Sequence, residues 1–416
     1  MSTQFEASTA PIAQPTNRRT IALLLGGLAL LGPLSVDAYL PAFASIQKSM
    51  HVGAAQVQYT LTAYMFSFAL MSLWHGALSD ALGRRKVILA SLVLFALASV
   101  GCAIAQDVTW LSGFRMLQGV SAGAGTVVGR AMIRDLYEGA PAARMLSLVS
   151  MIFALSPALA PVIGGWIVTA FEWRAIFVFL SAYTGLLLWS CARYLPETLP
   201  LADRQSLAPA SLLRSYTKVF MSVGFQTGAG AIAFNFAGLF LFVAAAPVIL
   251  GEHLGLSANQ FGWQFVPMVG GIFLGSWAAD RLTGKLSLQH QIGVGFVILL
   301  SAAVANVLYH AVLPPALPWS VSPIFFYAFG MSFASPGLTL IVLDLFPDIR
   351  GVVASMQSFT MVMLAAVVTA LLAPALQHSL LYLAIGQLVL GIAGLVLWLP
   401  TFVRKARADL RTGVLS

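Results

Sequence analysis

Charged residues are scarce in this sequence. Of its 416 residues, only 9% are Asp, Glu, Lys or Arg, whereas 59% are hydrophobic. A soluble domain carries roughly a quarter charged residues, so the composition excludes a soluble enzyme, a disordered chain and a coiled coil. The class that remains is a membrane protein with many spans. Each span needs about 20 apolar residues, so the length allows about a dozen of them.

Cysteine and clustered histidine are also scarce. Cys102 and Cys191 lie in separate apolar segments, and the six histidines stand singly, with no metal-ligand spacing and no accompanying nucleophile. We therefore expect no disulfide framework and no metal site. No nucleotide-binding loop is found either. The sequence predicts a protein that is not an enzyme, with no catalytic residue and no cofactor.

The intervals without charge predict twelve helices, because a charged side chain is costly in lipid. The two longest intervals, 286–343 and 351–403, exceed one crossing and are divided at 310–318 and 377–379. The predicted helices are 20–46, 54–79, 87–105, 109–137, 142–170, 174–194, 220–250, 258–280, 287–310, 317–346, 352–376 and 379–402.

The basic residues predict the orientation. With the N-terminus in the cytoplasm, 18 of the 22 Lys and Arg residues fall in cytoplasmic segments. Only Lys48 and Arg174 fall on the opposite side, and Arg115 and Arg130 lie within helix 109–137. This bias is typical of membrane proteins and explains the net charge of +8 better than nucleic-acid binding does, since the charges are spread over short segments. An even helix count puts both termini in the cytoplasm.

A polar stretch with several prolines, about 195–218, divides the chain into two halves of six helices. Asp80 and Asp280, each followed by basic residues, are a faint echo between them. Two such halves are an established transporter architecture, whereas a channel is disfavoured because no short re-entrant segment occurs. The predicted divisions are a tail 1–19, a bundle 20–194, a linker 195–219, a bundle 220–402 and a tail 403–416.

The turn between the second and third predicted helices contains a motif of small, acidic and basic residues. It runs Gly76-Ala-Leu-Ser-Asp80-Ala-Leu-Gly83-Arg84-Arg85-Lys86. Gly76 allows close helix approach, Gly83 can adopt a positive φ in the turn, and Asp80 can pair with a basic residue. Composition alone would suggest only a positively charged turn that sets topology. The spacing is more specific, because it resembles the G-x-L-x-D-x-x-G-R-R-x signature of the major facilitator superfamily.

Further motifs resemble one group of that superfamily. Residues 115–119 resemble its R-x-x-Q-G motif, and residues 161–165 resemble the end of its antiporter motif. Residues 36–43 and 129–137 resemble segments of the Bcr/CflA group of drug:proton antiporters. The resemblance implies an all-α membrane protein with twelve transmembrane helices in two six-helix halves. It also implies a monomeric exporter of drug-like molecules in the bacterial inner membrane, driven by protons. The second acid that some relatives carry is absent, since Ala29 occupies its position.

Asp37 is the only acid well inside a predicted helix. It lies roughly 13 Å deep, and Arg115 lies roughly 9 Å deep from the same side. Charge at these depths is expensive, so we expect Asp37 to pair with Arg115 or to be protonated. We predict that Asp37 and Arg115 couple proton movement to transport. The alternative is a static ion pair that locks helix packing.

Other residues are predicted to gate the transporter. By resemblance, Asp135, next to Arg134, bridges to Arg84 or Arg85 in the outward-open state and forms a conformational latch. Pro157 and Pro161 bend helix 142–170, and Gly164 and Gly165 allow close contact between helices, either as an ordinary kinked helix or as a seal between the halves. Candidate lining residues of a substrate cavity are Tyr64, Gln118, Arg130, Phe153, Asn235 and Gln357. Arg130 can instead snorkel to headgroups.

The most favoured function is proton-coupled efflux of drug-like small molecules by alternating access. Its expected partners are a drug substrate, protons and membrane lipid, without nucleic acid. Two alternatives remain: a proton-coupled or passive carrier of a metabolite such as an amino acid or sugar, and a receptor or assembly protein on a transporter scaffold.

Overall fold

The computed structural model describes residues 18–204, 207, 209–282 and 284–412, and this part of the chain is helical without a strand. Most of the predicted tail 1–19 and the last four residues of the tail 403–416 lie outside the described residues.

Twelve helical stretches are long enough to cross a membrane, as predicted. Ten of them are also strongly apolar over their length. The other two are the α5–α6 pair and α11, and they complete the set of twelve. The twelve stretches are α1 (Arg18–Asp37) with η1 (Leu40–Ala42) and α2 (Phe43–Met50), α3 (Ala54–Leu82), α4 (Arg84–Ala103), α5 (Val108–Ala122) with α6 (Ala124–Leu136), α7 (Gly139–Ala170), α8 (Arg174–Tyr194), α10 (Val223–Val248) with η3 (Ile249–His253), α11 (Gly262–Leu282), α12 (Leu288–Val312), α13 (Ser322–Asp344), α14 (Arg350–Val367) with η6 (Val368–Leu372) and α15 (Ala373–Leu376), and α16 (Leu380–Thr412).

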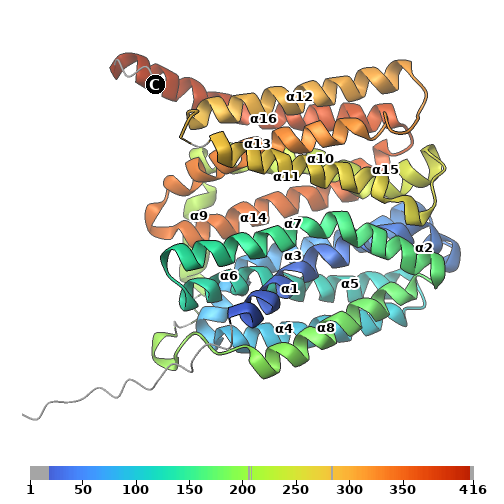
Figure 1. Cartoon of the computed structure of the whole chain (residues 1–416), viewed down its shortest axis with the longest axis horizontal. Helices are drawn as coiled ribbons and strands as arrows, with labels where there is room; N and C mark the ends of the chain where they lie inside the picture. Colours follow the sequence, from blue (N-terminus) through green and yellow to red (C-terminus); the bar gives the residue numbers. More distant parts are fainter. Residues whose placement is uncertain (1–17, 205–206, 208, 283, 413–416) are drawn as a thin grey trace, which may run out of the picture.

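The helices form two layers that lie side by side (Figure 1). Helices α1 to α8 make up one layer, and α10 to α16 make up the other. The layers meet where α3 packs on α14 and where α7 packs on α11 and on the short helix η4 (Ala258–Gln260). Helix α9 lies at the same end of the molecule as the described start of α1, and α2 and α15 lie at the opposite end (Figure 1). We call the end with α2 and η4 the outer end.

The structure breaks two helices that the charge pattern predicts as continuous. The first span stops its α-helix at Asp37, turns through Ala38 and Tyr39, and resumes in η1 and α2. The fourth span breaks at Gly123, between α5 and α6. Hydropathy cannot detect either break, because the residues at both breaks remain apolar and buried.

The linker contains a helix that the sequence did not indicate. Helix α9 (Pro209–Phe220) begins in the predicted linker 195–219 and ends one residue after it, and its Val219 is fully buried against Phe225 and Val353 of the second half. At the other end of the chain, α16 continues to Thr412, nine residues beyond the predicted start of the tail at 403.

Candidate functional site

Asp37 is the last residue of α1, at the point where the first span breaks. Its side chain is only 5% exposed. Among the described residues, its carboxylate has no hydrogen bond and no ion pair. Burying a carboxylate without a partner is costly, and binding a proton removes that cost. The position therefore suits a group that takes up and releases a proton.

Arg115 lies in α5 and is completely buried, but the structure does not pair it with Asp37. Its guanidinium carbon lies 4.6 Å from the ring centre of Tyr39 and 4.4 Å from that of Tyr64. Its Nη1 donates to Gln118 Oε1 at 2.8 Å and to Ser35 O at 3.2 Å. Two aromatic faces and two oxygens thus take the place of the expected carboxylate, since an arginine is attracted to the face of an aromatic ring.

The side chains around Arg115 form one buried network, which we call the Arg115 cluster: Ser35, Tyr39, Tyr64, Arg115 and Gln118. Tyr64 Oη donates to Gly32 O at 3.1 Å and accepts from Ser35 Oγ at 2.8 Å, so it ties α3 to the last turns of α1 before Asp37. Gln118 donates to Ser99 Oγ at 2.8 Å. Arg115 still has two nitrogens, Nε and Nη2, without a partner among the described residues. These two nitrogens can therefore donate hydrogen bonds to one further acceptor.

Tyr64 and Gln118 belong to this network, whereas the structure disperses the other four residues predicted to line a cavity. Arg130 on α6 and Phe153 on α7 are exposed. Asn235 on α10 is 1% exposed and packs against Gly394 of α16. Gln357 on α14 donates to Thr339 Oγ1 at 3.0 Å. A substrate contact by any of these four residues stays a prediction.

Two glycines of α7 lie on a close seam between helices. A Cβ placed on Gly164 would lie 2.1 Å from the carbonyl oxygen of Ala38, the residue after Asp37. A Cβ on Gly165 would lie 2.1 Å from the carbonyl oxygen of Ala258, in η4 of the other half. Atoms cannot approach so closely, so both positions need glycine. We call the contacts of Gly164 and Gly165 the glycine seam. Pro157 and Pro161 lie on the same helix, and the structure accommodates both inside α7.

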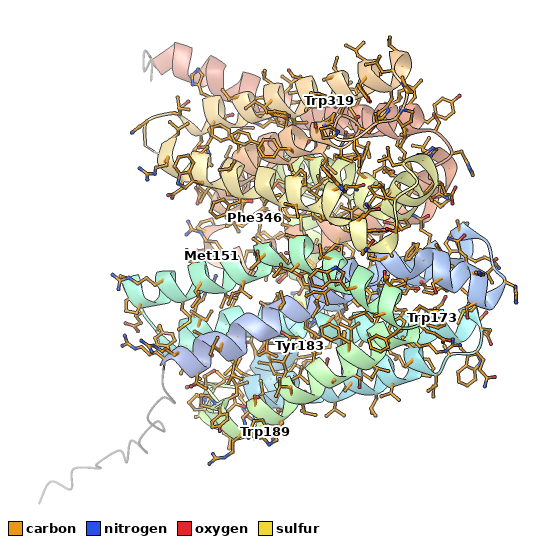
Figure 2. The ribbon with its side chains drawn as sticks, turned by 45° about the vertical axis from the view of Figure 1, so that its right-hand side comes forward. Met151, Trp173, Tyr183, Trp189, Trp319 and Phe346 are labelled. Atoms are coloured by element: carbon orange, nitrogen blue, oxygen red, sulfur yellow. The ribbon has the colours of Figure 1, made fainter. Side chains whose placement is uncertain are left out.

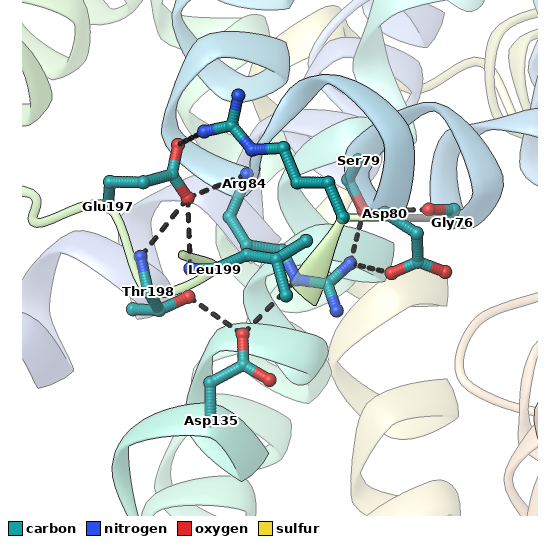
Figure 3. Close-up of polar contacts among 9 residues, drawn as sticks. Gly76, Ser79, Asp80, Arg84, Asp135, Glu197, Thr198 and Leu199 are labelled. Carbon is teal, nitrogen blue, oxygen red and sulfur yellow. Dashed lines mark hydrogen bonds and ion pairs between the residues drawn. The ribbon is translucent and has the colours of Figure 1, made fainter. Parts of the chain in front are cut away.

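The loop between α3 and α4 forms a second polar site around Arg84 (Figure 3). Arg84 Nε pairs with Asp135 Oδ2 of α6 at 3.1 Å. Its Nη1 donates to Ser79 Oγ at 2.6 Å and pairs with Asp80. Of the two candidate arginines, Arg84 makes the bridge to Asp135, and Arg85 instead donates to Ala192 O at 2.6 Å. We call the contacts of Arg84 with Asp80 and Asp135 the loop latch.

The start of the linker covers this latch, which the sequence did not indicate. Glu197 Oε1 accepts from the backbone N–H of Arg84 at 2.9 Å, at the first residue of α4. Thr198 Oγ1 donates to Asp135 Oδ2 at 2.7 Å, and Arg204 pairs with Glu197 at 3.7 Å. No signal in the sequence points to this contact, because Glu197 lies 113 residues from Arg84.

The two glycines of the loop differ. Gly83 has the conformation predicted for it, whereas Gly76 makes no close helix approach, since a Cβ there would lie at an ordinary contact distance from its neighbour. Gly83 adopts a φ of 101°, which favours glycine, and Glu197 and Arg204 fill the space where a Cβ would lie. Gly76 faces Val127 of α6, 4.0 Å from the position of a Cβ. Arg134, next to Asp135, is exposed.

Comparison with known proteins gives similarity over most of the chain. The sequence model of the Major Facilitator Superfamily matches residues 25–370. Multidrug resistance protein D of Escherichia coli (strain K12) is 30% identical over 92% of this chain and 96% of its own length. An uncharacterised MFS-type transporter, YdgK, of Bacillus subtilis (strain 168) is 34% identical over 75% of this chain and 79% of its own. A bicyclomycin resistance protein homologue of Haemophilus influenzae (strain ATCC 51907 / DSM 11121 / KW20 / Rd) is 31% identical over 66% of this chain and 69% of its own.

Solved structures share the fold. A D-xylose–proton symporter superposes with a TM-score of 0.68, covering 91% of this chain and 97% of its own, at 16% identity. A bacterial homologue of the human lysosomal transporter Spinster, in an inward-facing conformation, gives a TM-score of 0.66 over 93% of this chain and 97% of its own. At such identity these similarities concern the fold alone.

Proposed function

Because the chain belongs to the Major Facilitator Superfamily and is therefore a multi-pass membrane transporter, we propose that it exports drug-like small molecules in exchange for protons. Two of the relatives are named for resistance to drugs. The observation that carries the proposal for this chain is the carboxyl of Asp37, buried without a partner at the break of the first span.

Asp37 is the proposed proton acceptor. Its neutral form suits the buried position described here, since it leaves no uncompensated charge. When the carboxylate forms, the two unpartnered nitrogens of Arg115 offer the opposite charge and open donors. With Asp37 protonated, Arg115 would stay between the aromatic faces of Tyr39 and Tyr64. With Asp37 ionised, Arg115 would pair with the carboxylate instead.

The break after Asp37 supports a route from proton to conformational change. Ala38 follows Asp37 directly and packs on Gly164, while η1 contacts α7, α10 and η4. A shift of the backbone at Asp37 therefore acts on helices of both halves within five residues. In such a transporter, protonation would favour one arrangement of the halves, and release of the proton would favour the other.

The loop latch is the proposed element that stabilises one of the two arrangements at the opposite end. Arg84, Asp80 and Asp135 tie α3, α4 and α6 together within the first half. A rigid first half can move as a unit against the second half, which alternating access requires.

The proposed location is the bacterial inner membrane with both termini in the cytoplasm. The distribution of Lys and Arg supports this orientation. It puts the loop latch and α9 at the cytoplasmic face and the glycine seam toward the outside.

The test is proton movement driven by drug in proteoliposomes that hold a pH-sensitive dye. Wild-type protein is expected to move protons when a lipophilic cation such as ethidium is added on one side. Asp37→Asn is expected to abolish this movement. The matched control Asp203→Asn, an exposed acid of the linker, is expected to leave it unchanged.

Two results would contradict the proposal in different ways. Proton movement that survives in Asp37→Asn would remove the role of Asp37 while leaving export intact. Proton movement that no compound of a drug panel elicits, but that an amino acid or sugar elicits, would favour a metabolite carrier.

A further inference from the structure

A small cavity opens where the first residue of α1 and the C-terminal end of α6 meet the start of α7. Its volume is about 210 Å³, and none of the residues predicted to bind substrate lines it. Its lining consists of Arg18, Tyr137, Pro141, Arg144, Met145 and Leu148.

The polar side of this cavity is cationic. Arg18 and Arg144 both line it, and neither makes an ion pair with a carboxylate among the described residues. The nearest acid along the chain, Glu138, precedes α7 and is not part of the lining. Two guanidinium groups that line one cavity, with no carboxylate in its described lining, form a site for an anion. Guanidinium binds phosphate especially well because its donors match the phosphate oxygens.

Tyr137 adds a second, independent sign of a ligand. Its side chain lines the cavity and is only 8% exposed, and its hydroxyl is buried with no hydrogen-bond partner among the described residues. Buried hydroxyl groups are normally paired. The guanidinium of Arg18 lies 5.9 Å from the centre of the Tyr137 ring, so a hydroxyl that lacks a partner and a positive charge belong to neighbouring side chains.

The other side of the cavity is apolar. Met145 and Leu148 follow one another on α7 toward the membrane interior, and Leu148 is 40% exposed. A free phosphate ion would gain nothing from this wall, whereas a phospholipid could lay the start of an acyl chain along it. Basic pockets between helices at the cytoplasmic side are typical binding places for anionic headgroups.

We propose that this cavity binds the phosphate headgroup of an anionic phospholipid from the cytoplasmic leaflet. The phosphate accepts hydrogen bonds from Arg18, Arg144 and Tyr137, and the acyl chain follows Met145 and Leu148. The assignment to this leaflet rests on the orientation proposed above, whereas it does not depend on which compound is exported. A lipid held here would join the first helix to α7, which carries the glycine seam.

The test is lipid binding by native mass spectrometry of the purified full chain, titrated with phosphatidylglycerol. Arg18→Gln/Arg144→Gln is expected to weaken the tightest binding at least about tenfold, since two charge-assisted hydrogen bonds to the phosphate are lost. Tyr137→Phe keeps the charge and is expected to weaken it roughly threefold to tenfold, as loss of one hydrogen bond implies. Arg214→Gln/Lys218→Gln, which removes two positive charges from α9, serves as the matched control and is expected to bind as wild type.

Several outcomes would overturn the proposal. Equal losses in the cavity variant and the α9 control would mean diffuse attraction to the membrane surface. Displacement of the lipid by millimolar inorganic phosphate would mean a site for a soluble phosphate. If the double variant does not fold, Tyr137→Phe and Arg144→Lys decide the question, because both preserve the charge, and wild-type binding by both would refute the site.

Discussion

Gly164 leaves no room for a side chain next to the proposed proton site. We expect Gly164→Ala to lower transport at least about tenfold, because its methyl would meet the carbonyl oxygen of Ala38 at 2.1 Å and the backbone after Asp37 would have to move. Overpacking of this kind typically costs about 1–3 kcal/mol. Export of ethidium from cells, with protein amount measured in parallel, reports the effect. Gly185→Ala on α8 is the control, since its methyl would meet nothing within 4 Å. Equal activity of the two variants would refute the seam.

Glu197 gives a test of the linker contact at the loop latch. It accepts hydrogen bonds from the backbone of Arg84, Thr198 and Leu199. We expect Glu197→Ala to lower the free energy of unfolding by about 1–3 kcal/mol, because charge-assisted bonds to partly buried groups are lost, and to lower the melting temperature by several degrees. Thermal unfolding in detergent measures this. Glu172→Ala removes a Glu whose side chain is 81% exposed, and a shift as large in that control would contradict the assignment.

At the scale of helices, the spacing of charged residues in the sequence was sufficient to predict the twelve spans, but it did not predict where two of them break. Charge is excluded from lipid, so the gaps between charges locate each span. The breaks after Asp37 and at Gly123 depend on packing between helices, which hydropathy does not contain. Arg115 shows the same limit, since its place inside a helix could be predicted but not its position between the rings of Tyr39 and Tyr64. Glu197 was missed because its partner lies 113 residues away.

Helix α9 offers a prediction at this scale. Tyr216 Oη donates to Leu73 O of α3 at 2.5 Å, so α9 joins the linker to the first half while Val219 is buried against the second. Burial raises the pKa of Tyr216 above its usual value of 10, so the hydroxyl remains a donor at physiological pH. The linked stability is fully present below pH 10 and is lost as pH rises further.

We expect Tyr216→Phe to lower the free energy of unfolding by about 1 kcal/mol at pH 7.5. Thermal unfolding measures the loss, and Tyr59→Phe, at a side chain of α3 that is 50% exposed, is the control. Unchanged stability in Tyr216→Phe would show that α9 is held by its apolar face alone.

For the whole molecule, transport requires that the two halves separate at one end and meet at the other. The two halves can be followed in Figure 2, where Met151 labels the first half and Phe346 labels the second. Both glycines of the seam and the break after Asp37 lie at or near the outer end. At the glycine seam the halves meet through backbone and small side chains, with Gly165 of α7 against Ala258 of η4. Among the described residues, two side-chain hydrogen bonds run between helices of the two halves: Gln58 Nε2 of α3 donates to Ala244 O of α10 at 3.3 Å, and Thr369 Oγ1 of η6 donates to Met65 Sδ of α3 at the longer distance of 3.9 Å.

Gln58 should therefore bias the equilibrium between the two arrangements. We expect Gln58→Leu to shift the population toward an open outer end by about twofold to tenfold, because the lost hydrogen bond costs about 0.5–1.5 kcal/mol in the closed arrangement alone. Spin labels on Trp110→Cys and Trp319→Cys, which are exposed residues in loops or helix starts of opposite halves, would report the separation in a background of Cys102→Ala and Cys191→Ala.

The matched control removes a similar bond that does not cross between the halves. Gln291 Nε2 donates to Phe333 O at 3.1 Å, and both residues lie in the second half. Gln291→Leu loses the same chemistry in both arrangements, so the distance distribution should stay that of the wild type. A shift in Gln291→Leu as large as that in Gln58→Leu would mean that general destabilisation opens the protein. No shift in either variant would mean that the glycine seam, rather than Gln58, holds the outer end closed.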